Sequence, residues 1–406
     1  MSLDLTSLRA TAADDFLKSR LDAILDAISV SDLEMRLVGG PVYAFHPGAT
    51  AQSARIFLDH FPGTTLYAAK ANDLPEILTE LYAAGIENFD VASLAEIEKI
   101  MRACPGAVCH FMNPVKPLEA MTTAYKDHGV RTFAVDSFPE LRKVQRAVGR
   151  DSSVRIAVRL AVPDDSAAVS IGGKFGVQVG EASELLRSAA DFGYRPGVTF
   201  HVGGQCESIQ AYAKALGLVG TAAERARVAL SLVDVGGGFP GGYVDQKHML
   251  PEYFSVIRHA LSFVPLAVGA DVFCEPGRAL IADSITVVAR VELCRGQDIF
   301  INDGVYGALS ELPLLGSRIP VALVRDGRLM DGARGDYRLM GPTCNNIDVM
   351  TGPFSLPNAI AEGDWLLLGQ LGPYSTAIRT HFNGFYSDQF VFTPMKSHRP
   401  NATFVQ

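Results

Sequence analysis

The sequence predicts an α/β protein: a (β/α)8 barrel with a second, antiparallel β-rich domain. Three observations predict it. Short apolar runs alternate with amphipathic helical segments between residues 42 and 278, roughly eight such units recur there, and β-rich alternation without long helices follows residue 284. A doubly wound sheet usually has fewer strands and needs a different phosphate-loop signature, so the barrel agrees better with the pattern.

The composition indicates a globular chain that acts on a small molecule. Of its 406 residues, 48% are hydrophobic and 20% are charged, and the formal net charge is −8. Because no basic run is dense enough to overcome that charge, nucleic acid and anionic membranes are disfavoured as partners. The sequence shows neither an uninterrupted apolar stretch of about 18 residues nor a basic segment followed by an apolar one at its start.

The six cysteines include no CxxC pair. They are too few for a disulfide framework in a chain of this length, and they give no zinc signature. The sequence therefore predicts a reducing compartment and no metal site. We expect a cytoplasmic protein.

The predicted barrel strands are short apolar runs that end in a polar residue or a glycine. The first is VYAFH at residue 42, and the others begin near residues 65, 88, 107, 131, 154, 197, 231 and 271. Helices are expected between them, for example over 93–104 and 137–148, where apolar residues recur at i, i+3, i+4 and i+7. These elements place the barrel domain at residues 40–283.

The second domain is predicted from short alternating segments separated by Gly, Pro and Asp turns. Such runs begin at residues 284, 298, 319 and 364, and they read as an antiparallel sheet or a small barrel. The first 39 residues contain one helical segment, 14–28, which we expect to pack on that sheet. The second domain is therefore assigned to residues 1–39 and 284–406.

Polar residues and glycines follow the predicted strands at the edge where a barrel assembles its active site. In chain order they are Lys70, Asp90, Arg159, His201, the glycines 236–238, and Glu275 with Arg278. One such alignment arises easily by chance, but six in one chain do not. We expect these side chains to share a site.

Each feature has an ordinary structural explanation when it is taken alone. The GGGFPGG run at 236–242 is equally a phosphate-binding loop or a tight βα turn, and Glu275 with Arg278 is more often a structural ion pair. A single histidine such as His201 is more often a hydrogen-bonded core residue. Lys70 is the exception, because a charged lysine rarely stays buried without a partner.

Taken together, these residues meet the requirements of pyridoxal 5'-phosphate. This cofactor needs a Schiff-base lysine, a phosphate cradle, a partner for its ring nitrogen and a group against its ring face. Lys70 is predicted to bond to the cofactor and to be released as an amine when substrate arrives. Glu275 is predicted to keep the ring nitrogen protonated, so that the ring accepts the electrons left when a bond at Cα breaks.

Ten short motifs extend this prediction to a family. YAAKAN, FDVASLAEI, KFGV, HVGGQC, VDVGGGFPG, CEPGR, INDGVYG, GPTCNNID, LGPY and FNGFY occur in the order and spacing typical of one group of enzymes. From about residue 40 to 390 the chain resembles the fold-type III, alanine-racemase-like basic amino-acid decarboxylases, the ornithine and lysine decarboxylase family. The ordered set is far more specific than any single motif.

The resemblance implies a role for each cofactor-binding residue. Lys70 resembles the Schiff-base lysine, His201 the stacking residue and Glu275 the pyridinium partner. The phosphate site would be formed by Gly237, Gly238, Gly277, Arg278 and Tyr374, and the polar network around the lysine by Asp90, Glu96 and Arg159.

The resemblance also implies a homodimer with two shared active sites. Cys344 corresponds to the cysteine that protonates the product carbon, and it is expected from the neighbouring subunit. Without the family pattern it would be interpreted as an ordinary half-buried thiol. Tyr306 and Phe382 are candidates for the substrate side, although an aromatic core role is the default for a tyrosine.

Two positions depart from the family pattern. Gly204 stands where a serine hydroxyl usually helps to hold the phosphate, a contact that contributes roughly 1.5–3 kcal/mol. Asn345 stands where an aspartate normally faces the distal ammonium of the substrate. Glu311 or Asp348 is expected to supply that anion instead, although a solvated surface position is equally compatible with Glu311.

The predicted function is the decarboxylation of L-ornithine to putrescine, a step of polyamine biosynthesis. Lysine or another, less usual amino acid is the alternative, because Asn345 replaces the aspartate. Diaminopimelate is disfavoured because its distal carboxylate would need a basic pocket, and racemisation because that branch places arginine on the ring nitrogen. A non-catalytic regulator related to decarboxylases is the alternative of another class, and the presence of Lys70, Glu275 and Cys344 argues against it.

Overall fold

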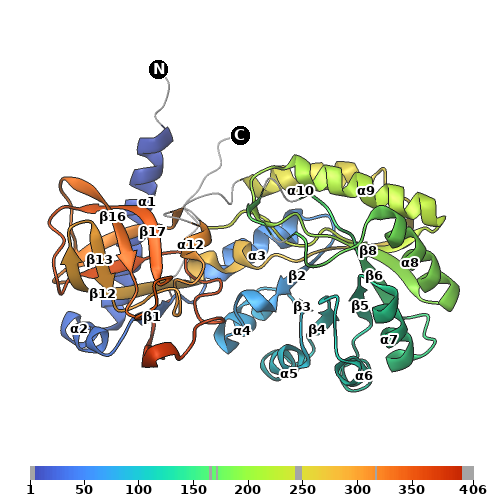
Figure 1. Ribbon diagram of the computed structural model, residues 1–406, viewed down its shortest axis with the longest axis horizontal. Coiled ribbons are helices and arrows are strands. Elements are labelled where there is room, and N and C mark those ends of the chain that lie inside the picture. Colours follow the sequence, from blue (N-terminus) through green and yellow to red (C-terminus); the bar gives the residue numbers. More distant parts are fainter. Residues whose placement is uncertain (1–4, 164–166, 171, 243–248, 316–317, 396–406) are drawn as a thin grey trace.

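The chain forms a barrel domain and a β-rich domain that lie side by side (Figure 1). The computed structural model describes residues 5–163, 167–170, 172–242, 249–315 and 318–395, with side chains from residue 12 onward. No helix in these ranges is both long and apolar enough to cross a lipid bilayer. The predicted fold class is confirmed.

Eight parallel strands close the barrel in the order β10-β11-β2-β3-β4-β5-β6-β8. Each is a short, largely apolar segment, as expected for strands that are covered on both faces. Their bounds are β2 (Thr64–Ala68), β3 (Asn88–Val91), β4 (Val108–Phe111), β5 (Thr132–Val135), β6 (Arg155–Arg159), β8 (Arg195–Thr199), β10 (Leu230–Asp234) and β11 (Leu266–Cys274).

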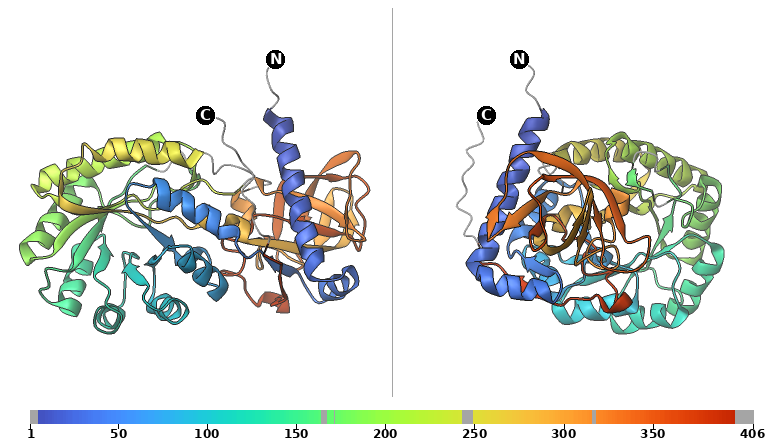
Figure 2. Two further views of the ribbon diagram at one scale, coloured as in Figure 1. Left: turned by 180° about the vertical axis from the view of Figure 1, so that it is seen from behind. Right: turned by 60° about the vertical axis from the view of Figure 1, so that its left-hand side comes forward.

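Helices surround the barrel, as the right-hand view of Figure 2 shows. They are α3 (Ala49–His60), α4 (Pro75–Ala83), α5 (Leu94–Ala103), α6 (Leu118–Asp127), α7 (Phe138–Val148), α8 (Val179–Phe192), α9 (Gln210–Ala226) and α10 (Leu250–Leu261). Local sequence explains where α5 begins. The Ser93 hydroxyl accepts the Glu96 N–H at 3.2 Å, and the Glu96 carboxylate accepts the N–H of Ala92 at 2.6 Å, so the first turn is capped from both sides.

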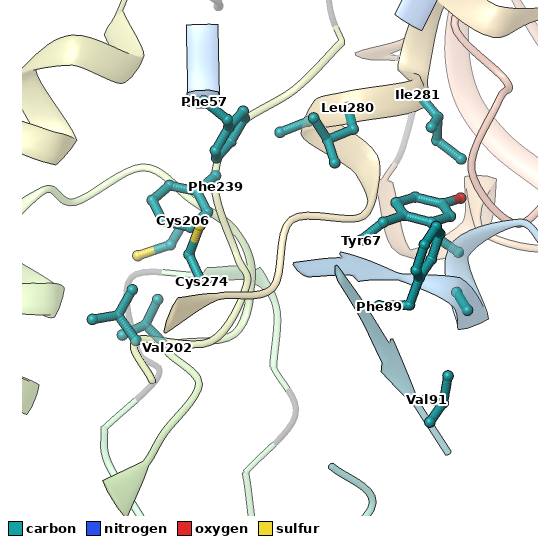
Figure 3. Packing of buried hydrophobic residues seen from close by; sticks show 14 of the residues in the cluster. Phe57, Tyr67, Phe89, Val91, Val202, Cys206, Phe239, Cys274, Leu280 and Ile281 are labelled. Atoms are coloured by element: carbon teal, nitrogen blue, oxygen red, sulfur yellow. The ribbon is translucent and has the colours of Figure 1, made fainter. Parts of the chain in front are cut away.

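Short elements at the mouth of the barrel carry the residues that the motifs identify. They are the single turn η1 (Ala69–Ala71), the two-stranded sheet of β7 (Ala167–Val169) and β9 (Gly204–Cys206), and the turns α11 (Arg278–Ile281) and η3 (Ala282–Ser284). Aromatic packing between barrel and helices supports this region. Figure 3 shows Phe57 of α3 against Phe239, and their ring centroids lie 5.4 Å apart.

The second domain is a nine-stranded sheet built on β12. Its main order is β15-β14-β18-β12-β13-β16-β17, and β1 and β19 extend it beside β12. Most pairs are antiparallel, as predicted, but β1 with β19 and β13 with β16 are parallel. The bounds are β1 (Val42–Phe45), β12 (Ile285–Arg295), β13 (Asp298–Ile301), β14 (Val321–Arg325), β15 (Arg328–Leu329), β16 (Arg334–Met340), β17 (Val349–Pro357), β18 (Trp365–Leu368) and β19 (Phe390–Phe392).

One predicted barrel strand belongs to the other domain. The run at residue 42 forms β1, which pairs antiparallel with β12 and parallel with β19 instead of entering the barrel. Its four residues are all buried, so its apolar pattern does not distinguish the two sheets. The remaining eight runs supply the eight barrel strands.

The N-terminal helices cover the second sheet, which agrees with the expectation for the segment 14–28. Helix α1 (Leu5–Ala27) contributes Leu17, Leu21 and Ile24 to a buried cluster, and α2 (Val30–Val38) contributes Leu33 and Leu37. Strands of the sheet provide the other side of that cluster. Two short elements, α12 (Leu312–Leu315) and η5 (Phe382–Gly384), complete the described domain.

We predict that His110 makes the fold sensitive to acid. This histidine is buried in the barrel, where its Nε2 donates to the Asn88 side chain at 3.0 Å and its ring packs edge-on to Phe273. Burial lowers the pKa of His110 from 6.5 to about 3, so the unfolded chain binds one more proton between these values. This contribution to stability is present above pH 6.5 and is lost as pH falls toward 3, by at most about 1.4 kcal/mol per pH unit.

The measurement is the free energy of unfolding by urea between pH 4.5 and 7.5. The His110→Gln variant should lose the part of the pH dependence that comes from this residue, so its curve should converge on that of the wild type as pH falls. His259→Gln, at an exposed position of α10, is the control and should run parallel to the wild type. Parallel curves for His110→Gln would contradict the prediction.

Candidate active site

A cavity of about 630 Å³ opens at the C-terminal ends of the barrel strands. Eleven residues that the sequence analysis singled out line it. They come from both domains and are Lys70, Asp90, Arg159, His201, Gly204, Gly238, Glu275, Gly277, Arg278, Glu311 and Tyr374. The strand-end residues therefore do share one site.

Lys70 enters this cavity from the turn that follows β2. Its side chain is 48% exposed, and its Nζ lies 3.4 Å from the carboxylate of Asp90, which is buried on the neighbouring strand β3. The Asp90 charge raises the pKa of the Lys70 ammonium above its ordinary value, against the effect of burial, and Glu275 adds to the increase. Glu96 lies behind this pair, where its carboxylate caps helix α5.

His201 lies two residues beyond β8 and presents a neutral ring. Its Nδ1 accepts the N–H of Gly203 at 3.0 Å, which leaves the proton on Nε2. Burial, followed by the charges of Arg159 and Lys70, lowers the pKa of His201 well below its ordinary value. A neutral, flat ring at the cavity wall suits stacking on an aromatic ligand.

Glu275 is a buried carboxyl group with a free acceptor. Its Oε1 has no hydrogen-bond partner among the described residues, which is uncommon for a buried polar atom. Burial raises the pKa of Glu275 well above its ordinary value, and the nearby carboxylates of Asp234 and Asp90 raise it further. Such a carboxyl group is suited to a ligand nitrogen that shares its proton.

Asp234 is a site residue that the sequence analysis missed. It is the fully buried last residue of β10, and its carboxylate accepts the N–H of Gly236 at 2.9 Å and the Thr199 hydroxyl at 3.2 Å. It therefore fixes the start of the glycine loop. The VDVGGG motif contained it, but an aspartate within an apolar strand gave no sign of its partners.

Arg278 begins α11 and binds a carboxylate from the second domain. Its guanidinium donates to Glu311 and lies 5.7 Å from the centroid of the Tyr374 ring. Glu311 is therefore not the solvated surface charge that was the alternative. The Tyr374 backbone, with φ of 62°, donates its N–H to the Ala71 carbonyl at 2.6 Å, which attaches this tyrosine to the turn that holds Lys70.

The glycine loop after β10 leaves room that any side chain would fill. A Cβ at Gly237 would lie 2.6 Å from the Glu275 carbonyl oxygen, and a Cβ at Gly238 would lie 2.2 Å from that of Gly203. Gly238 also has φ of +92°. Only glycine meets both conditions, so the backbone N–H groups here can approach a bound anion closely.

The two-stranded sheet of β7 and β9 explains the glycine at position 204. It pairs with Val169 across β7 and β9, and a Cβ at Gly204 would approach the Val169 side chain to 3.2 Å. A serine at this position would require Val169 to move. Close packing of the two strands therefore favours glycine at the position where the family pattern has a serine.

Pyridoxal phosphate fits the residues of this cavity. Lys70 supplies an amine, Glu275 an unpaired buried acceptor, His201 a flat ring, and the glycine loop with Arg278 an anion cradle. No single residue defines this ligand, but the set matches its aldehyde, ring nitrogen, ring face and phosphate.

The remaining predicted residues form a second group outside the cavity. Cys344 is exposed, and its thiol and its backbone N–H both lie 3.4 Å from the Asn383 side-chain oxygen. Tyr306 stacks against Phe382 with centroids 4.5 Å apart. Asn383 was not singled out, although it belongs to the FNGFY motif, because its contact with Cys344 joins segments 39 residues apart.

Asn345 and Asp348 have structural partners in this second group. The Asn345 amide donates to the Tyr306 hydroxyl at 2.7 Å. Asp348 is buried, and it accepts hydrogen bonds from the N–H of Val305 and from the N–H and hydroxyl of Thr343. The expectation that Asp348 supplies an anion to the substrate is therefore wrong, since its carboxylate is occupied in joining two loops.

The fold and the cavity define the class as a fold-type III pyridoxal-phosphate enzyme. The comparison with known families then gives the particular one. Residues 49–282 match the family described as pyridoxal-dependent decarboxylase, pyridoxal binding domain. The chain belongs to this family, so it is a pyridoxal-phosphate-dependent amino-acid decarboxylase.

Individual relatives agree with this assignment. The chain is 35% identical to a lysine/ornithine decarboxylase of Selenomonas ruminantium over 80% of its own length and 83% of the relative's. It is 31% identical to antizyme inhibitor 2 of Xenopus laevis over 79% and 73% of the two chains. The solved lysine/ornithine decarboxylase of Vibrio vulnificus, complexed with cadaverine, superposes with a TM-score of 0.75 at 28% identity over 89% and 96%. The two decarboxylases among these relatives indicate basic amino acids as the substrate class.

We predict that Gly238→Ala abolishes tight cofactor binding. The new Cβ would collide with the Gly203 carbonyl and strain a left-handed backbone, so the loop must leave its present position. The affinity for pyridoxal phosphate, measured by absorbance near ~420 nm, should fall at least about tenfold. Gly217→Ala, in helix α9 where an added Cβ meets nothing within 4 Å, is the control and should bind like the wild type. Equal affinities of the two variants would contradict this account of the loop.

Proposed function

We propose that the protein decarboxylates L-ornithine to putrescine, with lysine as the next candidate substrate. The observation that carries this proposal is the meeting of Lys70, Glu275 and the glycine loop in one cavity, together with relatives named for these activities. The regulator alternative has a relative in antizyme inhibitor 2. We favour catalysis because the chain has both the amine and the buried acceptor that the chemistry needs.

Each cavity residue has a role in this proposal. When bound, pyridoxal phosphate supplies an aldehyde that condenses with amines and a ring that accepts the electron pair left at Cα by departing carbon dioxide. Lys70 would hold the cofactor through its Nζ, and when a substrate amine takes that position, the freed Nζ would hold a proton beside Asp90. Glu275 holds a proton at the ring nitrogen, and His201 covers one ring face.

The phosphate would be held by backbone and charge together. Gly237, Gly238 and Gly277 offer close backbone approach, and Arg278 offers a guanidinium whose five donors allow it to bind a phosphate and Glu311 at once. Tyr374 lies against Arg278 at the domain boundary. Arg159 adds positive charge to the wall opposite Lys70.

We also propose a homodimer in which each active site receives Cys344 from the partner. Cys344 does not line the cavity of its own chain. Ile347, three residues after Cys344, is 65% exposed, and Ile378 and Phe385 are exposed on the segment of Asn383, which contacts Cys344. A second copy that covers this surface would bring a thiol to the cavity, where it would protonate Cα after carbon dioxide leaves. For this protein we also propose a role in polyamine biosynthesis and a location in the cytoplasm.

Glu311 is our candidate for recognition of the distal ammonium. Three carboxyl groups line the described cavity: Asp90, Glu275 and Glu311. Asp90 pairs with Lys70, and Glu275 is the proposed partner of the ring nitrogen. Asn345 carries no charge, and Asp348 is occupied. Glu311 binds Arg278 through one oxygen, Oε2, which leaves Oε1 for a substrate cation.

We predict that Lys70→Ala removes both turnover and the absorbance near ~420 nm, because no other side chain replaces its amine. The measurement combines carbon dioxide release with borohydride reduction and peptide mapping of the wild type, which should place the label on Lys70. Lys99→Ala is the control, since this lysine pairs with Asp73 outside the cavity. A label at another residue would overturn the assignment.

Mixing inactive variants tests the shared site. In the proposed dimer, each site takes Lys70 from one chain and Cys344 from the other. A mixed dimer of Lys70→Ala and Cys344→Ala chains therefore has both defects in one site and none in the other. In a 1:1 mixture, half of the dimers are mixed and half of their sites are intact, so about a quarter of the wild-type activity should return. No recovery after verified exchange of subunits would contradict the shared site.

We predict that Glu311→Gln raises KM for ornithine about tenfold or more while affecting norvaline, which lacks the distal ammonium, much less. Loss of a charge-assisted hydrogen bond weakens the binding free energy of the substrate by roughly 1.5–3 kcal/mol. Glu184→Gln, at an exposed position of α8, is the control. Carbon dioxide release with ornithine, lysine, arginine and diaminopimelate identifies the preferred substrate. An unchanged KM of Glu311→Gln for that substrate would exclude Glu311 as the group that binds the distal ammonium.

A further inference from the structure

The glycine loop that follows β10 is held in place mainly by groups outside it. Three of its glycines, Gly236, Gly238 and Gly242, have positive φ, which a flexible glycine chain adopts only as one of many conformations. Tyr212 donates its hydroxyl to the Gly237 carbonyl at 2.9 Å, and the Cys206 N–H donates to that of Gly238 at 2.8 Å. These contacts fix the first half of the loop.

Gln205 fixes the second half with both ends of its side chain. Its Nε2 donates to the Gly241 carbonyl at 2.9 Å, and its Oε1 accepts the Gly241 N–H at 2.9 Å. The amide therefore pairs with both backbone groups of one residue, as a neighbouring strand would. Both hydrogen bonds are buried, where an unmade bond costs about 1–3 kcal/mol.

Gly241, the residue that Gln205 holds, lies directly against the start of α11. A Cβ at Gly241 would come within 2.3 Å of the Ala279 Cα, and Ala279 follows Arg278 in the chain. Gln205 thereby sets the distance between the two halves of the anion cradle, the glycine loop and the arginine. A shift at Gly241 would move the loop away from Arg278 or press it against α11.

The position of Gln205 is itself fixed by β9. The residue has φ of 50° and lies between Gly204, which pairs with Val169, and Cys206, which pairs with Ala167. Figure 3 shows Cys206 and Phe239 close together in the packed cluster of this region. Because Gly204 provides no hydroxyl for a phosphate, the backbone arranged by its neighbour gains importance.

We propose that Gln205 is a positioning residue for the phosphate group of the cofactor: its side-chain amide holds the Gly241 peptide so that the glycine loop and Arg278 bind phosphate together. The inference rests on the proposed assignment of this loop to the phosphate. It concerns affinity for the phosphate group alone. Gln205 does not act on the aldehyde or the ring.

The test compares pyridoxal phosphate with pyridoxal, which has the same ring and aldehyde but no phosphate. Apoprotein of the wild type, Gln205→Leu and Gln205→Glu is titrated with each compound, and binding is followed by absorbance near ~420 nm. Gln205→Leu removes both hydrogen bonds at similar size. Gln205→Glu keeps the acceptor for the Gly241 N–H but loses the donor to the Gly241 carbonyl. If the leucine variant does not fold, the glutamate variant tests the inference.

We expect both variants to bind pyridoxal phosphate about ten- to a hundredfold more weakly than the wild type and to bind pyridoxal within about twofold of it. Gln297→Leu, in the exposed turn between β12 and β13, should leave both affinities unchanged.

Two results would overturn the inference. Wild-type affinity of the variants for pyridoxal phosphate would show that the loop does not depend on Gln205. Equal weakening for pyridoxal phosphate and pyridoxal would show a general structural role. Failure of the wild type to bind pyridoxal phosphate would instead overturn the proposed function, so the two failures are distinguishable.

Discussion

The ion pair between Lys70 and Asp90 is the contact on which the active site depends. It joins the turn η1 after β2 to the neighbouring strand β3 at the mouth of the barrel, where the lysine faces the cavity and the aspartate is buried. A buried carboxylate requires a partner, and a lysine used for covalent chemistry requires a defined position. One contact meets both needs, and it places the amine within the electrostatic influence of Glu275.

Closure of the barrel brings the other charged groups to this pair. Parallel strands in register align their C-terminal ends, so residues far apart in sequence reach one rim without special local structure. Within that rim, burial has opposite consequences for different groups. It lowers the pKa of His201 and raises the pKa of Glu275, which keeps a neutral ring beside a carboxyl group that holds its proton readily. The directions differ because histidine is charged when it is protonated and glutamate when it is deprotonated, and burial disfavours the charged form of each.

The second domain completes the cavity and carries the predicted site residues that lie outside it. Glu311 and Tyr374 reach the barrel from it and meet at Arg278. Cys344 lies on the same domain, but its loop is tied by Asp348 to the loop of Tyr306 and presents an apolar surface. The proposed dimer accounts for this position, because Cys344 does not line the cavity of its own chain.

The sequence by itself determined the barrel, the sheet domain and most of the residues that line the cavity, because strand ends and glycine motifs are local patterns. It did not place β1, since an apolar run fits a barrel and an open sheet equally well. It also gave no sign of the partners of Asp348, Glu311 or Gln205. Those contacts join segments that are distant in the chain, and only the packed structure decides which buried polar groups meet. Side-chain hydrogen bonds at long separation leave no periodicity, and that is why the tertiary structure was needed to separate positioning residues from those that face the ligand.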